Sequence, residues 1–299
     1  MKLNINKTLI HAACLATAVL SSTFTYAAQC SKEQNRDSYW YECDGVKVTQ
    51  STRGFFNDRI TEFQKKGDYV SWRYYDGMRN VSYYYTNRVW GNALKALTQG
   101  AFDSSNSRIS NFKVYGEHAT WKFYDGTRNT TRYYANRIWG NALIDLTQQA
   151  SGRSGDSITE FRTYGDHATW KFYDGTRNQT AYYSNKLWGR DLERLSQIAV
   201  GTFGSSVSNL NITKIYLLGD VYVTYKYYDG MRDRTAYYSN KIYGNSEKLL
   251  TQYADDRDND RISNFRVSTE NVQWTYYDGT RRTTKNYKNK VWGGTPTQL

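Results

Sequence analysis

Aromatic and aliphatic residues recur along this chain in short blocks that are separated by polar turns. Residues 109–112, 121–124 and 133–139 form three such blocks, and the second is followed by Asp125-Gly126. Blocks of this length that are rich in aromatic and β-branched residues and bounded by Gly, Asp or Asn are typical of strands. The pattern therefore predicts three strands, with the second and third joined at Asp-Gly.

The same pattern returns five times, which is the signature of a repeat architecture. Its marker, Asp-Gly, begins at positions spaced by 49, 49, 55 and 49 residues, namely Asp76, Asp125, Asp174, Asp229 and Asp278. Upstream, residues 39–45 resemble the hairpin of a truncated repeat. Six extra residues precede the fourth marker, and all but one, near Gly219, are assigned to the linker 201–209. We expect a leader at 1–27, an N-terminal segment at 28–58, and repeats at 59–107, 108–156, 157–210 with the longer linker, 211–260 and 261–299.

Asp-Gly between two strands favours a two-residue type I′ hairpin turn, in which Gly and Asp adopt positive φ values. Such a turn fixes the register, and it would place Tyr74 opposite Arg79 on one face of the sheet. An aromatic ring facing a guanidinium group in this way predicts a cation–π contact in every repeat. The equivalent pairs are Phe123 with Arg128, Phe172 with Arg177, Tyr227 with Arg232, and Tyr276 with Arg281.

A run such as Asn92-Ala-Leu-Lys-Ala-Leu-Thr98 follows Trp-Gly and predicts a short helix that Asn caps. The predicted fold is therefore mainly β, with three strands and a short helix in each repeat. Two arrangements of the repeats remain open. A closed, five-bladed, propeller-like ring is favoured because the incomplete end copies could complete each other. The alternative is an open array in which atypical end units act as caps.

The N-terminus indicates export. Lys2 and Lys7 precede an apolar stretch at 9–20 and small residues up to Ala27, as in a secretory signal peptide. We therefore expect a secreted protein, extracellular or periplasmic. Its mature part retains Cys30 and Cys43, and an even pair of cysteines in an oxidising compartment predicts a disulfide. No later stretch is apolar enough to predict a transmembrane span.

The charge favours anionic partners. The formal charge of the chain is +12, and removal of a leader that holds two lysines and no acidic residue lowers it to +10. A strongly basic protein attracts polyanions, which here include sulfated or sialylated glycans, other anionic polymers and cell surfaces. The 29 tyrosines and 9 tryptophans add flat rings on which sugars can stack. Arginine in turn can make bidentate bonds to sulfate or carboxylate.

The candidate ligand-binding residues are those that recur beyond the needs of a hairpin. They are the arginine after Asp-Gly, the aromatic residue expected to face it, and the asparagine of a Tyr-x-Asn-basic step. The candidates are Arg79, Arg128, Arg177, Arg232 and Arg281, then Tyr74, Phe123, Phe172, Tyr227 and Tyr276, then Asn87, Asn136, Asn185, Asn240 and Asn289. Two sets of tryptophans, at 72, 121, 170 and 274 and at 90, 139, 188 and 292, are predicted to pack in the core.

The sequence predicts no catalytic residue, metal site or cofactor. After the leader only His118 and His167 remain, at equivalent positions next to apparent turns, and the metalloprotease, nucleotide-hydrolase and serine-hydrolase motifs are missing. We therefore expect a lectin-like or adhesin-like binding protein that gains avidity from repeated sites. One alternative is a glycan-active enzyme with two converging carboxylates. The other is a structural matrix protein that binds nucleic acid with strong salt dependence.

Overall fold

The structure is a computed structural model that describes residues 28–140, 142–189, 191–215, 220–242 and 246–299, so the predicted leader at 1–27 lies outside the described residues. The described chain is built from antiparallel sheets in succession, and the predicted mainly β, repetitive fold is confirmed. We name the sheets the N-terminal unit and units 1 to 5. No helix among the described residues is long and apolar enough to cross a membrane.

The first three units contain short and long strands together with single 3₁₀ turns, which are labelled η. The N-terminal unit contains β1 (Cys30–Asn35), β2 (Ser38–Cys43), β3 (Val46–Lys47) and η1 (Gly54–Phe56). Unit 1 contains β4 (Arg59–Lys66), β5 (Tyr69–Asp76), β6 (Val81–Arg88), β7 (Lys95–Ala96), β8 (Ala101–Phe102) and η2 (Asp103–Ser105). Unit 2 contains β9 (Arg108–Tyr115), β10 (His118–Asp125), β11 (Thr130–Arg137), β12 (Ile144–Asp145), β13 (Ala150–Ser151) and η3 (Gly152–Ser154).

The last three units repeat this order. Unit 3 contains β14 (Ser157–Tyr164), β15 (His167–Asp174), β16 (Gln179–Lys186), β17 (Glu193–Arg194), β18 (Ala199–Val200) and η4 (Gly201–Phe203). Unit 4 contains β19 (Ser206–Ile215), β20 (Asp220–Asp229), β21 (Arg234–Lys241), β22 (Lys248–Leu249), β23 (Ala254–Asp255) and η5 (Asp256–Asp258). Unit 5 contains β24 (Arg261–Ser268), β25 (Asn271–Asp278), β26 (Thr283–Lys290) and β27 (Thr297–Gln298).

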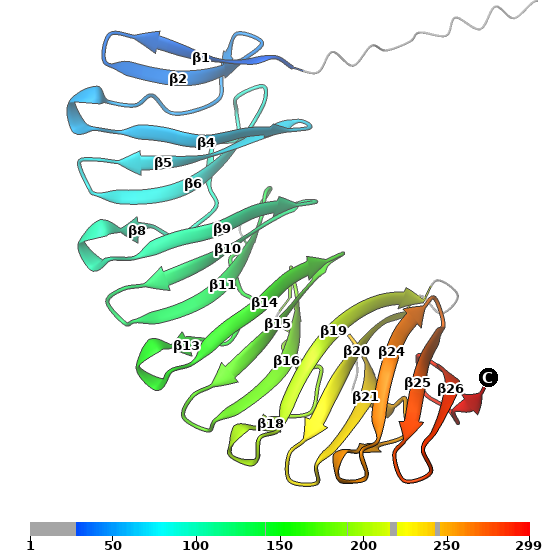
Figure 1. Cartoon of the computed structure of the whole chain (residues 1–299). Coiled ribbons are helices and arrows are strands. Elements are labelled where there is room, and N and C mark those ends of the chain that lie inside the picture. Colours follow the sequence, from blue (N-terminus) through cyan, green and yellow to red (C-terminus); the bar gives the residue numbers. More distant parts are fainter. Residues whose placement is uncertain (1–27, 141, 190, 216–219, 243–245) are drawn as a thin grey trace, which may run out of the picture.

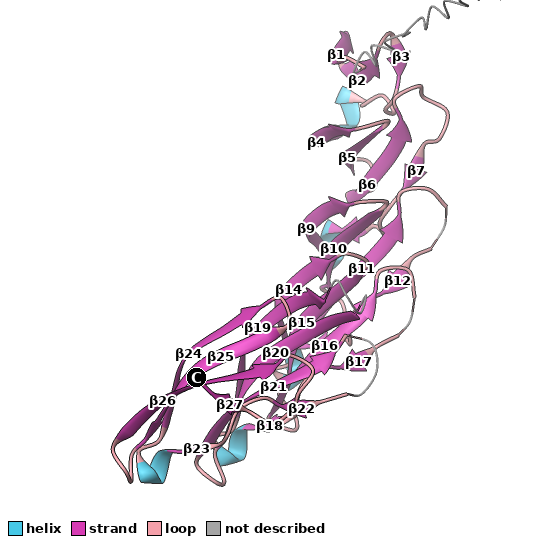
Figure 2. Cartoon of the chain, turned by 90° about the vertical axis from the view of Figure 1, so that its right-hand side faces the viewer, coloured by secondary structure: helices cyan, strands magenta, loops and turns pink. Residues whose placement is uncertain are grey.

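The units follow one another along an open curve, with the N-terminal unit and the C-terminus at opposite ends (Figure 1). Of the two arrangements that the sequence left open, the described units follow the open array in this view. In each full unit the three long strands form a meander, and short strands pair with the third. Among these short strands, β7, β12 and β17 lie along one side of the array (Figure 2).

The core lies between neighbouring units, and at three junctions a ring from the third strand stacks on the first strand of the next unit. Tyr84 stacks on Phe112 with ring centroids 3.9 Å apart, and Tyr133 on Phe161 and Tyr237 on Phe265 do the same. Stacking transfers apolar area from water to a neighbouring ring, so each unit stabilises the next. The third junction differs, since Tyr182 packs in a cluster with Leu210 instead of a phenylalanine.

One set of tryptophans belongs to this core, and the other is divided, since Trp139 and Trp292 pack against core clusters while Trp90 and Trp188 are exposed. Trp72, Trp121, Trp170 and Trp274 are buried, and each indole N–H donates to a glutamine 22 residues earlier, at 2.8–3.2 Å. For these four, the predicted core packing is confirmed. Trp90 and Trp188 are 52% and 41% exposed. For these two the prediction is wrong, because they follow the third strand where it leaves the sheet.

The hairpin at Asp-Gly is a four-residue loop, and the predicted two-residue turn is wrong. Asp76 pairs with Val81, so that Tyr74 lies opposite Tyr83 and not opposite Arg79. The residue with a left-handed backbone is Asn80, at φ 49°, and not Gly77. Glycine is required at 77 for another reason, since a Cβ there would lie 1.7 Å from the backbone oxygen of Phe56. The other four Asp-Gly pairs meet the same kind of contact, at 1.8–2.0 Å.

The short helix predicted over Asn92–Thr98 is also wrong, because the backbone there pairs with the third strand. Asn87 Oδ1 accepts the N–H of Ala93 at 2.8 Å, and the N–H of Leu97 donates to the oxygen of Tyr84 at 2.7 Å. Strand β7 pairs with β6 between these two bonds. The helical turn that precedes each full unit lies in the preceding linker, as η1 to η5.

Four of the six extra residues before the fourth Asp-Gly lie in the strands β19 and β20 and not in a linker, and the one predicted near Gly219 lies outside the described residues. The N–H of Ser205 donates to the oxygen of Val200, which reproduces the bond from Asp156 to Ser151 one unit earlier. Linkers with the same bonds and spacing have the same length. The excess follows Ser205, and β19 and β20 have ten residues each where β14 and β15 have eight. The predicted boundary at 210/211 and the longer linker are therefore wrong, and unit 4 begins at Ser206.

The predicted disulfide is confirmed: Cys30 and Cys43 are bonded to each other. These two residues also lie opposite each other in the pairing of β1 with β2. Cys43 is fully buried in the cluster that contains Val48, Val70 and Trp72. The bond therefore joins β1 to β2, and the packing of Cys43 ties this hairpin to the core of unit 1.

Candidate ligand-binding site

A hollow recurs beside the hairpin loop in units 3, 4 and 5, and we name it the tip hollow. Its volume is about 340 Å³ in units 3 and 4 and about 330 Å³ in unit 5. Equivalent positions line it each time: an aromatic residue of the second strand, the Asp and Arg of the loop, a tyrosine of the third strand and a preceding glutamine. They are Phe172, Asp174, Arg177, Tyr183 and Gln148 in unit 3, then Tyr227, Asp229, Arg232, Tyr238 and Gln197 in unit 4, then Tyr276, Asp278, Arg281, Tyr287 and Gln252 in unit 5.

The wall of the tip hollow consists of two aromatic rings that meet edge to face. In unit 4, Tyr227 of β20 and Tyr238 of β21 have centroids 6.2 Å apart and ring planes at 83°. The hydroxyl of Tyr238 lies 3.4 Å from that of Tyr253, which lies between β22 and β23 of the same unit. Burial raises the pKa of Tyr227 and of Tyr238. Both hydroxyls are therefore neutral near pH 7 and can donate or accept hydrogen bonds.

Positive charge stands at the rim. Arg232 is highly exposed and pairs with Asp229 at 3.3 Å, and the next arginine, Arg234, pairs with Asp255 at 2.9 Å. The bond from Arg234 keeps the pKa of Asp255 below its ordinary value. Asp229 Oδ1 accepts the backbone N–H of Met231 and of Arg232, at 3.1 and 3.2 Å. Its carboxylate thus builds the loop and is paired with a cation.

Units 3 and 4 differ from units 1 and 2 at the position that faces the aromatic residue of the second strand, whereas unit 5 has Lys285 there and still forms a hollow. Ala181 and Ala236 lie opposite the aromatic residue of the second strand in the open units. In unit 1 this position is Tyr83, whose ring lies 5.9 Å from that of Tyr85. In unit 2 it is Arg132, which pairs with Asp145 at 2.5 Å and donates to Gln149 at 3.1 Å. A large side chain thus occupies the corresponding space.

The five predicted arginines lie on the hairpin loops, along the convex edge of the curve in Figure 1. Their side chains are 72–80% exposed, and each guanidinium group lies 3.3–4.0 Å from the Asp three residues earlier. Arg177, Arg232 and Arg281 line tip hollows. The aromatic residues Phe172, Tyr227 and Tyr276 line the same hollows, although they do not lie opposite the arginines. The predicted partners therefore meet as neighbours around the hollow.

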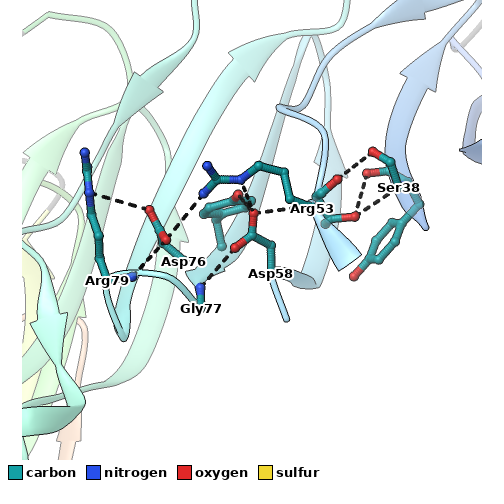
Figure 3. A network of polar contacts seen from close by, with 9 residues as sticks. Ser38, Arg53, Asp58, Asp76, Gly77 and Arg79 are labelled. Carbon is teal, nitrogen blue, oxygen red and sulfur yellow. Dashed lines mark hydrogen bonds and ion pairs between the residues drawn. The ribbon is translucent and has the colours of Figure 1, made fainter. Parts of the chain in front are cut away.

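Unit 1 shows how a buried acid fixes the loop (Figure 3). Asp58 accepts hydrogen bonds from Arg53 Nε at 2.8 Å, from the hydroxyl of Tyr74 at 2.8 Å and from the N–H of Gly77 at 3.0 Å. Desolvation, the largest single effect, raises the pKa of Asp58, but these hydrogen bonds together outweigh it. The pKa therefore lies below its ordinary value. Tyr74 and Arg79 act in this framework, and Arg79 contacts Asp76 (Figure 3).

The five predicted asparagines lie apart from the tip hollows, buried in contacts between units. They are only 3–6% exposed. Each amide nitrogen donates to a backbone oxygen of the segment before its unit, at 2.8–3.1 Å. Each amide oxygen accepts backbone N–H groups of its own unit. Asn87, Asn136, Asn185, Asn240 and Asn289 therefore connect neighbouring units.

The residues that the sequence prediction missed are the third-strand tyrosine of each hollow and the alanines at 181 and 236. The repeats hold a signal for the alanines. The residue that faces the aromatic residue of the second strand is Tyr, Arg, Ala, Ala and Lys in the five copies, whereas its neighbours in the sequence change little. Both histidines lie directly after turns, at the start of strands. His118 and His167 begin β10 and β15 and are buried strand residues, and His118 lies 5.9 Å from the ring of Trp188 in the next unit.

The tip hollows contain aromatic rings and arginines, which suit binding, and few acidic groups of the kind that catalysis uses. Each is lined by one acidic residue of the loop, whereas glycoside hydrolysis uses two carboxyl groups across the substrate. Within the described ranges, no group of three or more His, Cys, Asp or Glu residues is placed to hold a metal ion. What recurs is an aromatic wall next to an exposed guanidinium group.

No protein-family model and no curated protein matches the chain. Among solved structures it is similar to a prolyl endopeptidase, with 10% identity and a TM-score of 0.37 over 81% of this chain and 35% of the other. It is also similar to the polysaccharide lyase Uly1, with 10% identity and a TM-score of 0.35 over 86% and 75%. The β-propeller domain of the Trilobed protease from Pyrococcus furiosus has 11% identity and a TM-score of 0.30 over 92% and 96%. The chain thus spans about a third of the endopeptidase, and likenesses this low establish neither a family nor an activity.

Proposed function

We propose that this is a secreted, multivalent binding protein that holds anionic glycans in its tip hollows. The observation that carries the proposal is the recurrence of one hollow in three successive units, each time with an aromatic wall and an exposed arginine. Aromatic faces pack against sugar rings, and guanidinium groups bind sulfate or carboxylate in bidentate fashion. The signal-like leader and the bonded pair Cys30–Cys43 support export to an oxidising compartment.

Repetition compensates for weak single sites. Each tip hollow is shallow and open, so one sugar unit would bind it weakly. A polymer that reaches two or three hollows binds the later ones intramolecularly, which raises the apparent affinity by about two to four orders of magnitude. The formal charge of +10 expected for the mature chain adds long-range attraction for a polyanion.

A glycan array probed at two salt concentrations tests the proposal. We expect sulfated or sialylated glycans to be retained at the higher salt concentration, with neutral glycans bound weakly. Replacing Arg177, Arg232 and Arg281 together by Ala should lower the apparent affinity about a hundredfold, because one charge-assisted contact is lost in each hollow. Arg79→Ala with Arg128→Ala is the matched control, since these arginines are equally exposed on loops whose hollow is occupied.

The alternatives give different results. If the control variant loses as much affinity as the triple variant, the protein binds polyanions through charge alone, as a nucleic-acid-binding matrix protein would. Shortened glycan products after incubation would instead indicate the glycan-active enzyme. If neither glycans nor polyanions are retained at the lower salt concentration, the proposal fails.

A further inference from the structure

A second hollow lies where units 1 and 2 meet, and we name it the junction groove. Its volume is about 400 Å³, and it is lined by side chains from β5, β6, β8, β9, β10 and β11. Lys122 and Arg73 project into it from the second strands. Each directly follows a tryptophan of the other face, Trp121 and Trp72, because successive side chains of a strand point to opposite faces. The junction groove is therefore separate from the tip hollows.

Three cations from two units line the junction groove, together with one acidic residue, Asp103. Arg73 belongs to unit 1, and Arg108 and Lys122 belong to unit 2. Arg73 is engaged, since it lies 3.8 Å from Glu62 and donates to Ser82 at 3.3 Å. Arg108 stacks over the ring of Tyr124, 5.3 Å from its centroid. Among the described residues, neither Arg108 nor Lys122 forms an ion pair, so both charges are available to a ligand.

The other junctions lack this combination. Where unit 2 has Arg108, units 3 and 4 have Ser157 and Ser206. In unit 3 the counterpart of Lys122 is Lys171, which lies 3.7 Å from Glu160. In unit 5 the arginine returns as Arg261, but the counterpart of Lys122 is Thr275. Three convergent cations therefore occur only between units 1 and 2 in the described part of the chain.

We propose that the junction groove binds a sugar that carries a sulfate or phosphate monoester. A tetrahedral oxyanion accepts charge-assisted hydrogen bonds from Arg and Lys, and the stacked Tyr124 holds the Arg108 guanidinium in a fixed orientation. Ser110 lines the same groove and supplies a hydroxyl donor. The groove is much larger than one oxyanion, which leaves room for the sugar ring. This site does not depend on the tip hollows or on their ligand.

The test is a chemical-shift titration of the full mature chain with glucose 6-sulfate, glucose 6-phosphate and glucose, at physiological salt. We expect both esters to shift the amide signals of Ser110 and Tyr124, and glucose to leave them unchanged. Lys122→Gln and Arg108→Gln should each weaken ester binding about tenfold, as expected for loss of a charge-assisted hydrogen bond. The tighter-binding ester then identifies whether a sulfated or a phosphorylated sugar is the ligand.

Controls separate this site from bulk charge and from the tip hollows. Lys171→Gln removes an equivalent lysine at the next junction and should leave ester binding unchanged. The variant without Arg177, Arg232 and Arg281 should also keep it, so failure at one site is distinguishable from failure at the other. The inference is overturned if glucose shifts the same signals as strongly, if Lys171→Gln weakens binding as much as Lys122→Gln, or if the esters leave Ser110 and Tyr124 unchanged.

Discussion

Units 2 and 3 share twelve identical residues, at 118–129 and 167–178, and yet their hollows differ. The shared stretch forms the same strand and the same hairpin loop in both units. The difference comes from the facing strand, where Arg132 stands in unit 2 and Ala181 in unit 3. The framework of a unit is thus shared, while the space beside its loop depends on the side chains that face it, of which Arg132 and Ala181 are one contrast.

The largest expected effect tests the shared framework. Gly126→Ala and Gly175→Ala would each bring a Cβ to within 1.9–2.0 Å of a backbone oxygen of the preceding 3₁₀ turn. Because the backbone must move, each change should lower the free energy of unfolding by about 1–3 kcal/mol, measured by urea denaturation. The exposed neighbour Thr127→Ala is the control and should change it by less than about 0.5 kcal/mol. Tolerance of only one glycine variant would mean that the two loops are not equivalent.

The next prediction concerns a variant that closes an open hollow. Ala181→Arg gives unit 3 the side chain that unit 2 carries, so the fold should be retained while affinity for a sulfated glycan falls about tenfold through loss of one site. Ala181→Ser keeps the space open and should bind like the unmodified protein. Since the variant adds a positive charge, a gain in affinity would mean that charge outweighs the hollow. Surface plasmon resonance on an immobilised sulfated glycan measures both variants.

A third prediction compares the acid of unit 1 with the serine that replaces it in unit 2. Asp58→Ser imitates Ser107, which donates no charge to the loop but still accepts the N–H of its glycine. Because the pKa of Asp58 is lowered by folding, its contribution is present above the unfolded pKa of about 3.9 and is lost as pH falls through the folded value. The variant should therefore lose about 1 kcal/mol at pH 7 and much less near pH 2, by thermal unfolding. A loss that does not change with pH would contradict the ionised state of Asp58.

The smallest expected effect comes from a variant that opens a hollow. Arg132→Ala should create a further tip hollow in unit 2 and raise the apparent affinity for a long sulfated glycan about threefold through one more site. The sign is informative, because removal of a positive charge would weaken binding if charge alone were responsible. Arg128→Ala in the same unit removes a charge without opening space, so it should not raise affinity. A short glycan that reaches one hollow should show no gain with either variant.

The sequence predicts the repeats, the disulfide and the buried tryptophans, because each leaves a periodic or paired signal. It misleads at Asp-Gly, since that dipeptide is also a hairpin signal, whereas here Gly77 is needed for the close approach of Phe56. The residue with the left-handed loop conformation is Asn80, and asparagine is a residue type that signals this conformation in a sequence. The asparagines such as Asn87 recur for a reason that only the neighbouring unit reveals, because their partners lie 39 residues away.

The sequence predicts only part of the candidate site, for a related reason. Arg177 and Phe172 were identified by recurrence, although their expected pairing across the strands was wrong. Ala181 was missed because recurrence draws attention to what the copies share, while the open space depends on a position where they differ. An open hollow also forms where side chains are small, and small side chains carry no chemical group that would mark a binding site in the sequence.

The ring stacks between units have a consequence for how the molecule unfolds. Because each stack joins only adjacent units, the array behaves as a line of nearest-neighbour couplings, and its cooperativity is set by the weakest of them. The junction of units 3 and 4 differs in kind, because Tyr182 meets Leu210 there within an apolar cluster that Val207 and Val223 complete. Under denaturant or tension the array should therefore separate at junctions between units, and each block that separates should keep the tip hollows of its own units.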